Sequence, residues 1–410
     1  MYNTVFYIII GIIVFDYFLE RWLNSLNAKH RSSELPAELK GVYDEEKYKK
    51  SIDYDKVSSK FEFVTSTLDF VIILLMLFLG GFAWVDTMAG NFTVDPIVKA
   101  LVFFAILGFA SDILHTPFSI YDTFVIEEKF GFNKTTFKTF IFDKIKGLLL
   151  SIIIGGVLAY VILWFYYKTT DMFWIYAWAL TSGFMVFMAM FYSNLIVPLF
   201  NKQEPLEEGE LKEAISQFAS KVGFKLDNVY RIDGSKRSTK ANAYFTGLGS
   251  KKRIVLYDTL IKELSTNEIV AVLAHEIGHY KRKHTLQGIV LSVLQMGITF
   301  YLLSLFLSIP SLSLALGVYQ PSFHIGIIAF GILYSPFSLI IGLLMNILSR
   351  KNEYEADAFT NEFFHAEHLI SSLKKLSVNN LSNLTPHPWY VFFHYSHPTL
   401  LQRIKALRKS

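Results

Sequence analysis

Seven long runs of apolar residues constrain the fold of this chain more than any other feature of its sequence. They cover residues 3–20, 63–85, 94–114, 147–167, 173–195, 286–309 and 324–348. A helix needs about 20 predominantly apolar residues to cross the hydrocarbon core of a bilayer, and each run approaches that length. Charged residues make up only 18% of the chain, against about 25% in soluble proteins. The sequence therefore predicts an α-helical multi-pass membrane protein with seven transmembrane helices.

The distribution of lysine and arginine predicts how these helices are oriented. Connections on one side hold 21 of these residues, in segments 21–60, 118–144 and 349–410. The 15 in the connection at 196–285, on the same side, are left out because that connection is too long for the rule to apply cleanly. Connections on the other side hold 1, in segments 87–93, 168–172 and 310–323. Because basic loops stay in the cytoplasm, we expect the amino terminus outside and the carboxyl tail inside. The first run lacks a basic leader region and a small-residue cleavage site, so we expect a retained anchor.

The same runs divide the chain into four parts. They are a five-span region at 1–195, a soluble insert at 196–285, a transmembrane hairpin at 286–348 and a carboxyl-terminal segment at 349–410. The insert and the tail are expected to form one α/β domain at the cytoplasmic side. Four polar residues within spans fit either a polar interior or positions near helix ends; they are Asp16, Asp69, Asp112 and Asn346.

Two features of the composition exclude other classes of function. The chain contains no cysteine, which excludes disulfides and thiol catalysis. Its net charge of +4 arises in the loops, and no basic stripe with interleaved aromatic residues indicates a nucleic-acid partner.

An HExxH motif, formed by His275, Glu276 and His279, lies just before the sixth apolar run. Residues four apart share one face of a helix, so both imidazoles can bind one Zn²⁺, and Glu276 can deprotonate the attacking water. The motif ends an apolar segment that follows Ser265 and Glu268, a capping-box pattern for a helix start. The alternative is a surface helix with two incidental histidines. The context favours zinc chemistry at a membrane.

A third metal ligand must come from elsewhere, because catalytic zinc usually has three protein ligands and leaves the fourth position for water. Glu353 is the best candidate, since it directly follows the seventh run on the side of the insert. Asp357, four residues later, could accept the free ring N–H of His275 or His279. Glu355 and Asp357 are also carboxylates within reach, and a charged helix surface would have the same sequence. The residues alone leave these choices open.

The soluble insert contains a predicted β-hairpin. Its strands are residues 242–246 and 253–257, which flank a turn that contains two glycines. One edge of this hairpin could hold an extended peptide by main-chain hydrogen bonds. A hairpin that only packs on the catalytic helix would fit the sequence equally well.

Taken together, these segments resemble the CAAX prenyl proteases of type 1, which are integral-membrane zinc metallopeptidases of the gluzincin type. The matching segments are 198–201 with 205–206, 234–238, 242–245, 253–260, the HExxH motif, 353–357 and 396–398. The amino-terminal half matches more diffusely, through 35–36, 50–51, 54 and 117–133. The resemblance therefore extends over nearly the whole chain.

The resemblance implies a role for individual residues. Glu353 would be the third ligand of a single Zn²⁺, and His397 would line the catalytic centre and donate to the oxyanion. Asp357 and Arg403 would support the site, the guanidinium either by anchoring a carboxylate or by bracing a site acid. The peptide would bind at Asn242, Ala243 and Tyr244. We expect structural roles for His284, His387 and His394.

The resemblance also implies a substrate and a chamber. The substrate would be a peptide with a carboxyl-terminal CAAX sequence, usually prenylated on its cysteine, which loses its last three residues. The seven helices would enclose a chamber with the zinc at its inner end. Two alternatives remain: a membrane quality-control metalloprotease, and a transporter or lipid-binding chamber with a structural metal. The membrane would be the plasma membrane of a prokaryote or the endoplasmic reticulum of a eukaryote.

Overall fold

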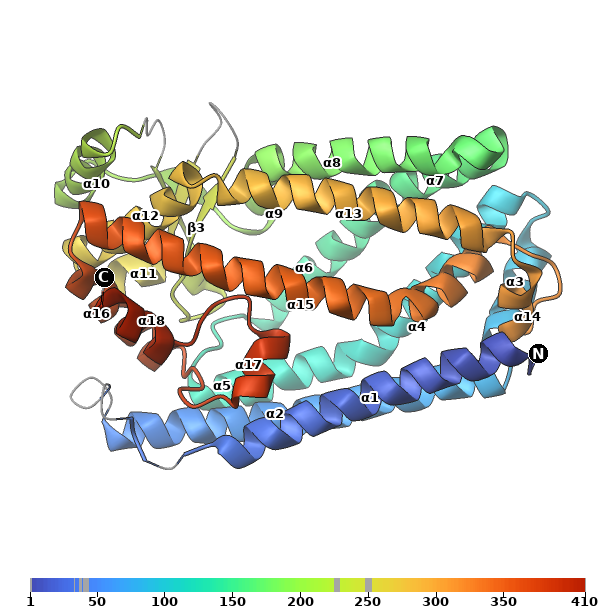
Figure 1. The fold of residues 1–410 in the computed structure, drawn as a ribbon, viewed down its shortest axis with the longest axis horizontal. Helices are drawn as coiled ribbons and strands as arrows, with labels where there is room; N and C mark the ends of the chain where they lie inside the picture. The colour runs from blue at the N-terminus through green and yellow to red at the C-terminus, as the bar shows by residue number, and fades with distance from the viewer. Residues whose placement is uncertain are drawn as a thin grey trace.

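The computed structural model describes residues 2–32, 34–36, 39, 44–224, 229–247 and 253–409. Long helices run lengthwise through the molecule (Figure 1). They are α1 (Thr4–His30), α2 (Glu45–Phe78), α4 (Pro96–Tyr121), α6 (Phe137–Leu150), α7 (Gly156–Thr169), α8 (Phe173–Leu195), α13 (His284–Leu307) and α15 (Phe323–Phe363). The sheet and several shorter helices gather at one end, and α3 (Gly81–Phe92) and α14 (Pro310–Ala315) lie at the other.

Short helical segments connect several of the long helices. Helix α4 continues through η2 (Asp122–Glu127) into α5 (Glu128–Phe130), and α6 continues through η3 (Ser151–Gly155) into α7. A turn, η4 (Thr170–Met172), separates α7 from α8, and α9 (Val197–Phe200) leads from α8 to the sheet.

Five stretches of the described chain are long and apolar enough to cross a membrane, against the seven predicted. They are Glu45–Phe78, Pro96–Phe130, Phe137–Phe200, His284–Leu307 and Phe323–Phe363. Only 6–11% of the residues in their most apolar windows are buried within the protein. Helices that are apolar all round and yet unburied require lipid around them. The chain is therefore a helical multi-pass membrane protein.

The difference in number arises at two places. The fourth and fifth predicted spans both fall within Phe137–Phe200, which forms one continuous apolar stretch bent at η4. The first predicted span forms α1, but Asp16, Glu20 and Arg21 interrupt its apolar run, so it is not among the five.

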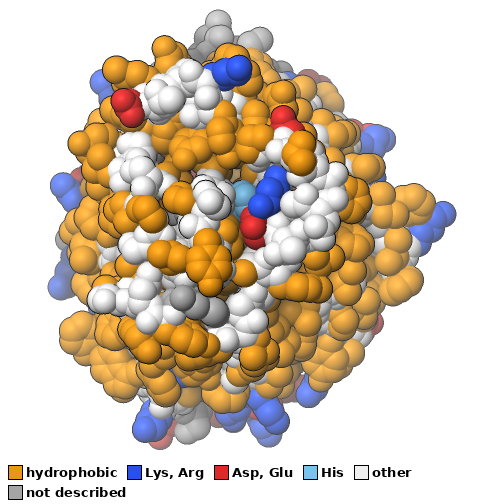
Figure 2. Space-filling view, turned by 90° about the vertical axis from the view of Figure 1, so that its right-hand side faces the viewer, with side chains coloured by type: hydrophobic (Ala, Val, Ile, Leu, Met, Phe, Trp, Pro, Cys, Tyr) orange, Lys and Arg blue, Asp and Glu red, His pale blue; other side chains and the backbone are white. Residues whose placement is uncertain are grey.

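The predicted span at 63–85 has different ends in the structure. Helix α2 begins 18 residues earlier, at Glu45, and ends at Phe78. Gly80 then takes a left-handed conformation with φ of +69°, which a glycine adopts without steric cost, and α3 begins at Gly81. Apolar residues continue on both sides of this break, so hydropathy alone did not reveal it. Figure 2 views this end of the molecule, where hydrophobic side chains dominate the surface.

The four polar residues of the predicted spans all contact another part of the chain. The pairs are Asp16 with Ser335 at 2.7 Å, Asp69 with His115 at 2.8 Å, Asp112 with Lys144 at 2.6 Å, and Asn346 with the Phe393 carbonyl at 2.8 Å. Each pair joins different helices, so these groups hold neighbouring helices together in surroundings where an unpaired polar group is costly.

A small mixed sheet builds the domain at the other end. Its strands are β1 (Gln203–Pro205), β2 (Val229–Ile232), β3 (Ala243–Thr246) and β4 (Arg253–Tyr257), in the order β1-β2-β4-β3. Strands β2 and β4 pair in parallel, and the other two pairs are antiparallel. The predicted hairpin is thus confirmed as β3 and β4, although most of its turn, residues 248–252, lies outside the described residues. Strand β3 forms an edge of the sheet.

Six helices of the described chain complete this domain. They are α10 (Glu210–Lys221), α11 (Asp258–Glu263), α12 (Thr266–Lys281), α16 (Ala366–Asn379), α17 (Pro388–His394) and α18 (Leu400–Leu407). One apolar core joins α10, the sheet and α12, with Ile215, Leu256 and Leu273 fully or almost fully buried. A second core joins α12 to α16 and α18. Helix α12 is therefore fixed on both sides.

Candidate active site

Helix α12 carries the HExxH motif, as predicted. Ser265 accepts a hydrogen bond from the Glu268 amide, and the Glu268 carboxylate accepts one from the Ser265 amide, so the expected capping box is present. Gly278 lies against α15, where an added Cβ would meet the Ala356 backbone at 3.1 Å. The absence of a side chain at Gly278 thus lets α12 and α15 approach closely enough to share one site.

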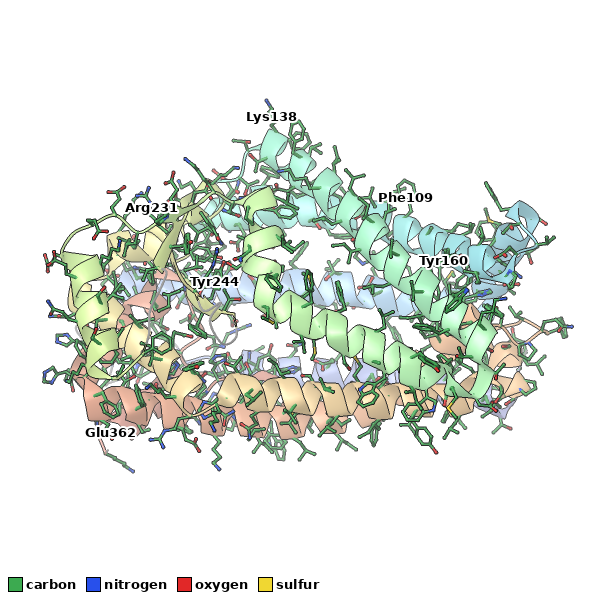
Figure 3. The ribbon with its side chains drawn as sticks, turned by 90° about the horizontal axis from the view of Figure 1, so that it is seen from above. Phe109, Lys138, Tyr160, Arg231, Tyr244 and Glu362 are labelled. Carbon is green, nitrogen blue, oxygen red and sulfur yellow. The ribbon has the colours of Figure 1, made fainter. Side chains whose placement is uncertain are left out.

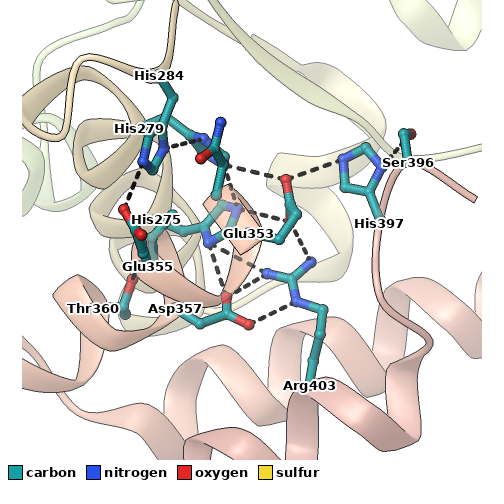
Figure 4. A network of polar contacts seen from close by, with 12 residues as sticks. His275, His279, His284, Glu353, Glu355, Asp357, Thr360, Ser396, His397 and Arg403 are labelled. Carbon is teal, nitrogen blue, oxygen red and sulfur yellow. Dashed lines mark hydrogen bonds and ion pairs between the residues drawn. The ribbon is translucent and has the colours of Figure 1, made fainter. Parts of the chain in front are cut away.

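Three side chains converge between these two helices. The Nε2 atoms of His275 and His279 lie 3.2 Å apart. Glu353, from α15, places Oε1 3.2 Å from His279 Nε2 and Oε2 3.4 Å from His275 Nε2. One ligand atom from each residue lies within 4.8 Å of the others. Glu353 and His275 are buried, so this cluster of donors is shielded from bulk solvent (Figure 4).

The spacing of these residues is compatible with a tetrahedral metal. Bonds of about 2.0–2.1 Å at tetrahedral angles separate two ligand atoms by about 3.4 Å. The two Nε2 atoms lie 3.2 Å apart, and Glu353 Oε1 lies 3.2 Å from the Nε2 of His279. Glu353 Oε2 is also buried without a hydrogen bond, because its contacts with His275 and Arg403 lack hydrogen-bond geometry. A buried carboxylate oxygen needs a partner, and a metal ion supplies one. His275, His279 and Glu353 can therefore hold a metal ion.

A buried ion pair supports the first of these ligands. Asp357 Oδ1 lies 2.9 Å from His275 Nδ1, so the imidazole presents Nε2 towards the other ligands. Arg403, from α18, donates from Nε to Asp357 at 2.9 Å and also contacts the second oxygen. Burial and Arg403 lower the pKa of His275, but Asp357 and Glu353 outweigh them and raise it to about 9. The guanidinium thus braces a site acid, one of the two roles expected for it.

His397 approaches the site from the loop between α17 and α18. Its Nε2 lies 3.2 Å from Glu353 Oε1, its Nδ1 lies 2.9 Å from Ser396 Oγ, and its side chain is 63% exposed.

Glu276 and His279 line a cavity of about 310 Å³ together with Phe245 of β3. The cavity therefore connects Glu276, one of the candidate metal ligands and strand β3.

The predicted peptide-binding residues lie on the edge strand that borders this cavity. Ala243 and Tyr244 pair with β4 on one side, and no described strand pairs with the other side of β3. Asn242 is exposed directly before the strand. Tyr244 lies at the end of the sheet that faces the long helices (Figure 3), and its hydroxyl contacts Ser193 of α8 at 3.3 Å.

One neighbour of the candidate ligands, His284, has contacts that the sequence did not indicate. His284, expected to be structural, places Nδ1 3.1 Å from Nδ1 of His279, and Glu355 lies 3.1 Å from His284 Nε2. Nothing in the sequence indicated that Gly278 lies against α15 either. His387 and His394 lie away from the cluster; His387 caps α17, and His394 lies 3.4 Å from Glu20. A histidine five residues after the HExxH motif was the one signal available for His284.

Comparisons with known proteins agree with this geometry. The family described as CAAX prenyl protease N-terminal, with five membrane helices, matches residues 24–202, and peptidase family M48 matches residues 205–410. The CAAX prenyl protease 1 of Saccharomyces cerevisiae is 36% identical, with 92% of this chain and 89% of the relative covered. A homologue of CAAX prenyl protease 1 from Oryza sativa is 38% identical over 92% of both chains, and the one from Homo sapiens is 32% identical over 97% of this chain and 94% of the relative.

The fold agrees equally well. The crystal structure of Ste24p from S. mikatae superimposes with a TM-score of 0.94 at 34% identity, and covers 99% of this chain and 100% of that one. Both halves of the sequence, their order and the complete fold thus match one group of proteins, and the chain belongs to the CAAX prenyl protease family of M48 metallopeptidases.

Proposed function

We propose that this protein is a zinc-dependent endopeptidase that releases the last three residues of prenylated CAAX substrates. Membership of the family makes it a membrane metalloprotease that acts on CAAX proteins or peptides. The observation that carries the proposal is the convergence of His275, His279 and Glu353 beside Glu276 and the edge of β3, which no described strand covers. Two imidazoles and one carboxylate form a catalytic zinc set that leaves a fourth position open.

The residues around the ligands would carry out the hydrolysis. When bound, Zn²⁺ supplies Lewis-acid chemistry, which polarises the scissile carbonyl and acidifies water. Glu276 would accept the proton of the attacking water and deliver it to the leaving amine. His397 is exposed and lies beside the ligands, so its imidazole can donate to the developing oxyanion. Asp357 and Arg403 would keep His275 in the correct tautomer and orientation.

The edge of β3 would hold the substrate. An extended peptide can add to this edge by main-chain hydrogen bonds, with Asn242 at its start and Ala243 and Tyr244 along it. Phe245 borders the same cavity as Glu276, so a peptide on this strand would pass the proposed base. The alternative, a hairpin that only packs on α12, does not explain why no described strand pairs with this edge beside the candidate ligands.

We further propose a seven-span topology with the site at the cytoplasmic side. In this topology α1 is the first span, and Phe137–Phe200 contributes two, with the turn at η4 outside. The bias of lysine and arginine supports this orientation. The four predicted parts at 1–195, 196–285, 286–348 and 349–410 remain a working division, although α15 runs continuously through residue 348. The relatives named above are all eukaryotic, which supports the endoplasmic reticulum as the membrane.

The proposed function is tested with purified protein and a farnesylated peptide that ends in a CAAX sequence. We expect release of the terminal tripeptide, loss of release after chelation, and recovery after addition of Zn²⁺. Glu276→Gln should bind Zn²⁺ as wild type does and release no tripeptide, whereas Glu213→Gln, on the exposed face of α10, should remain active. Turnover by metal-loaded Glu276→Gln would refute the role of the base. Cleavage of unprenylated membrane proteins alone would favour quality control.

A further inference from the structure

The turn after α12 brings His284 back onto the metal site. Helix α12 ends at Lys281, and α13 begins at His284, so only Arg282 and Lys283 separate them. Lys283 has a φ of +62°, a left-handed conformation that is unfavourable for a residue with a side chain. As a result the His284 side chain is 7% exposed and contacts His279 instead of solvent. The tight turn thus places a third imidazole behind the second ligand.

The direction of hydrogen bonding in this cluster follows from the role of His279. Its Nε2 faces His275 and Glu353, so the metal would take the Nε2 lone pair and the proton of His279 must lie on Nδ1. That N–H points at His284 Nδ1, which must therefore accept. Neutral His284 then carries its own proton on Nε2 and donates it to Glu355 at 3.1 Å. A single arrangement of protons therefore gives a partner to each ring nitrogen of His279 and His284.

We infer that His284 and Glu355 are positioning residues that hold His279 in its metal-binding orientation. This inference rests on the proposed function of the same site. The two histidine ligands are supported in different ways: His275 donates directly to Asp357, which is buried and paired with Arg403. His279 reaches its carboxylate only through an intervening imidazole. A ligand imidazole is generally fixed by such a partner on its second nitrogen, and loss of the partner weakens metal binding.

The surroundings explain why an imidazole is required at this position. Glu355 is 41% exposed and also lies 3.7 Å from Lys351, at the rim of the domain. His279 is more deeply placed, with a 22% exposed side chain. His284 bridges this distance with an acceptor on one side of its ring and a donor on the other. A residue that provides only one of these functions should support His279 incompletely.

Zinc affinity of the purified full-length protein tests this inference, measured by competition with a chromogenic chelator. His284→Phe removes both functions and should weaken the affinity about 10–100-fold. His284→Asn keeps an acceptor oxygen at the position of Nδ1 but loses the donor towards Glu355, so it should lose less affinity than His284→Phe. His284→Gln keeps only the donor towards Glu355 and should behave like His284→Phe. His365→Phe, at the start of α16, is the control and should match wild type.

Two further measurements separate positioning from a general loss of structure. Co²⁺ bound in place of Zn²⁺ should show an altered visible spectrum in His284→Phe, because the orientation of His279 changes the ligand field. Glu355→Ala should weaken zinc binding, and Glu355→Gln, which keeps an acceptor oxygen, should not. If His284→Phe does not fold, the contrast between His284→Asn and His284→Gln carries the test.

The outcomes distinguish this inference from the proposed function. Wild-type protein that binds no stoichiometric Zn²⁺ would overturn the proposed function. Normal zinc binding by wild type with an unchanged affinity in His284→Phe would overturn the inference alone. Equal affinities of His284→Asn and His284→Gln would overturn it as well, because the acceptor at Nδ1 would then have no part in holding His279.

Discussion

Glu268 should stabilise the catalytic helix strongly at neutral pH. Its buried carboxylate accepts hydrogen bonds from Ser265 at the start of α12, and from Ser371 at 2.6 Å and Lys375 at 2.8 Å on α16. Burial alone would raise its pKa, but these three donors outweigh burial and lower the pKa from 4.5 to about 2. This difference corresponds to about 3 kcal/mol of stabilisation.

The sign of the pH dependence follows from the lowered pKa. The folded protein binds the Glu268 proton less tightly than the unfolded chain, so the carboxylate makes its full contribution to stability above pH 4.5. This stabilisation is lost as the pH falls from 4.5 towards 2. The substitution Glu268→Gln removes the stabilisation at every pH. We therefore expect the substitution to loosen the contact between α12 and α16 at neutral pH, and acid to loosen the same contact in wild type.

Amide hydrogen exchange reports this local opening without requiring reversible unfolding of a membrane protein. At pH 7, amides of α12 in Glu268→Gln should exchange about 100-fold faster than in wild type, as 3 kcal/mol implies. Glu213→Gln, on α10, serves as the matched control. The reasoning would be refuted if the amides of α12 were equally protected from exchange in Glu268→Gln and in wild type. It would also be refuted if protection in wild type stayed constant below pH 4, after correction for intrinsic exchange rates.

Two further substitutions test the packing and the charges of the site. Gly278→Ala would place a Cβ 3.1 Å from both the Ala356 backbone and Phe359 Cβ; it should displace α15, cost about 1–3 kcal/mol and reduce zinc retention on dialysis. Retention equal to wild type would contradict this. Arg403→Met leaves Asp357 buried without its cation and should cost about 3–5 kcal/mol, measured as a lower thermal inactivation temperature; an unchanged temperature would show that the ion pair contributes little.

Much of the site was predictable from local sequence, because its chemistry depends on helical spacing. His275 and His279 are four residues apart, as are Glu353 and Asp357, and each pair shares one helix face in the structure. The helix start at Ser265 was predictable too, since a capping box is a local interaction. The hairpin followed from two runs rich in aromatic and aliphatic residues on either side of a glycine-containing turn. Where one or two turns of backbone determine the outcome, the sequence was sufficient.

Features that depend on distant contacts were not predictable. The position of His284 depends on the left-handed conformation of Lys283, which no residue preference indicates. The role of Gly278 depends on where α15 lies. Helix α2 ends at Phe78, just before the left-handed Gly80, and the apolar residues on both sides of this break concealed it. The sequence left the choice among the carboxylates of 353–357 open, whereas in the structure the helix phase directs Glu353 and Asp357 inward and Glu355 to the rim.

The length of α15 gives a physical reason why the site should lie at the depth of the lipid headgroups. Its 41 residues span about 60 Å, twice the thickness of the hydrocarbon core. If Phe323 lies at the outer boundary, about 20–23 residues cross the core with a moderate tilt, and Glu353 follows about 10–15 Å beyond it. One continuous helix therefore fixes the distance between the bilayer and the ligand. A substrate with a lipid on the cysteine beside the scissile bond needs that distance to be short, because its lipid favours the hydrocarbon while its peptide favours water. A site at headgroup depth satisfies both.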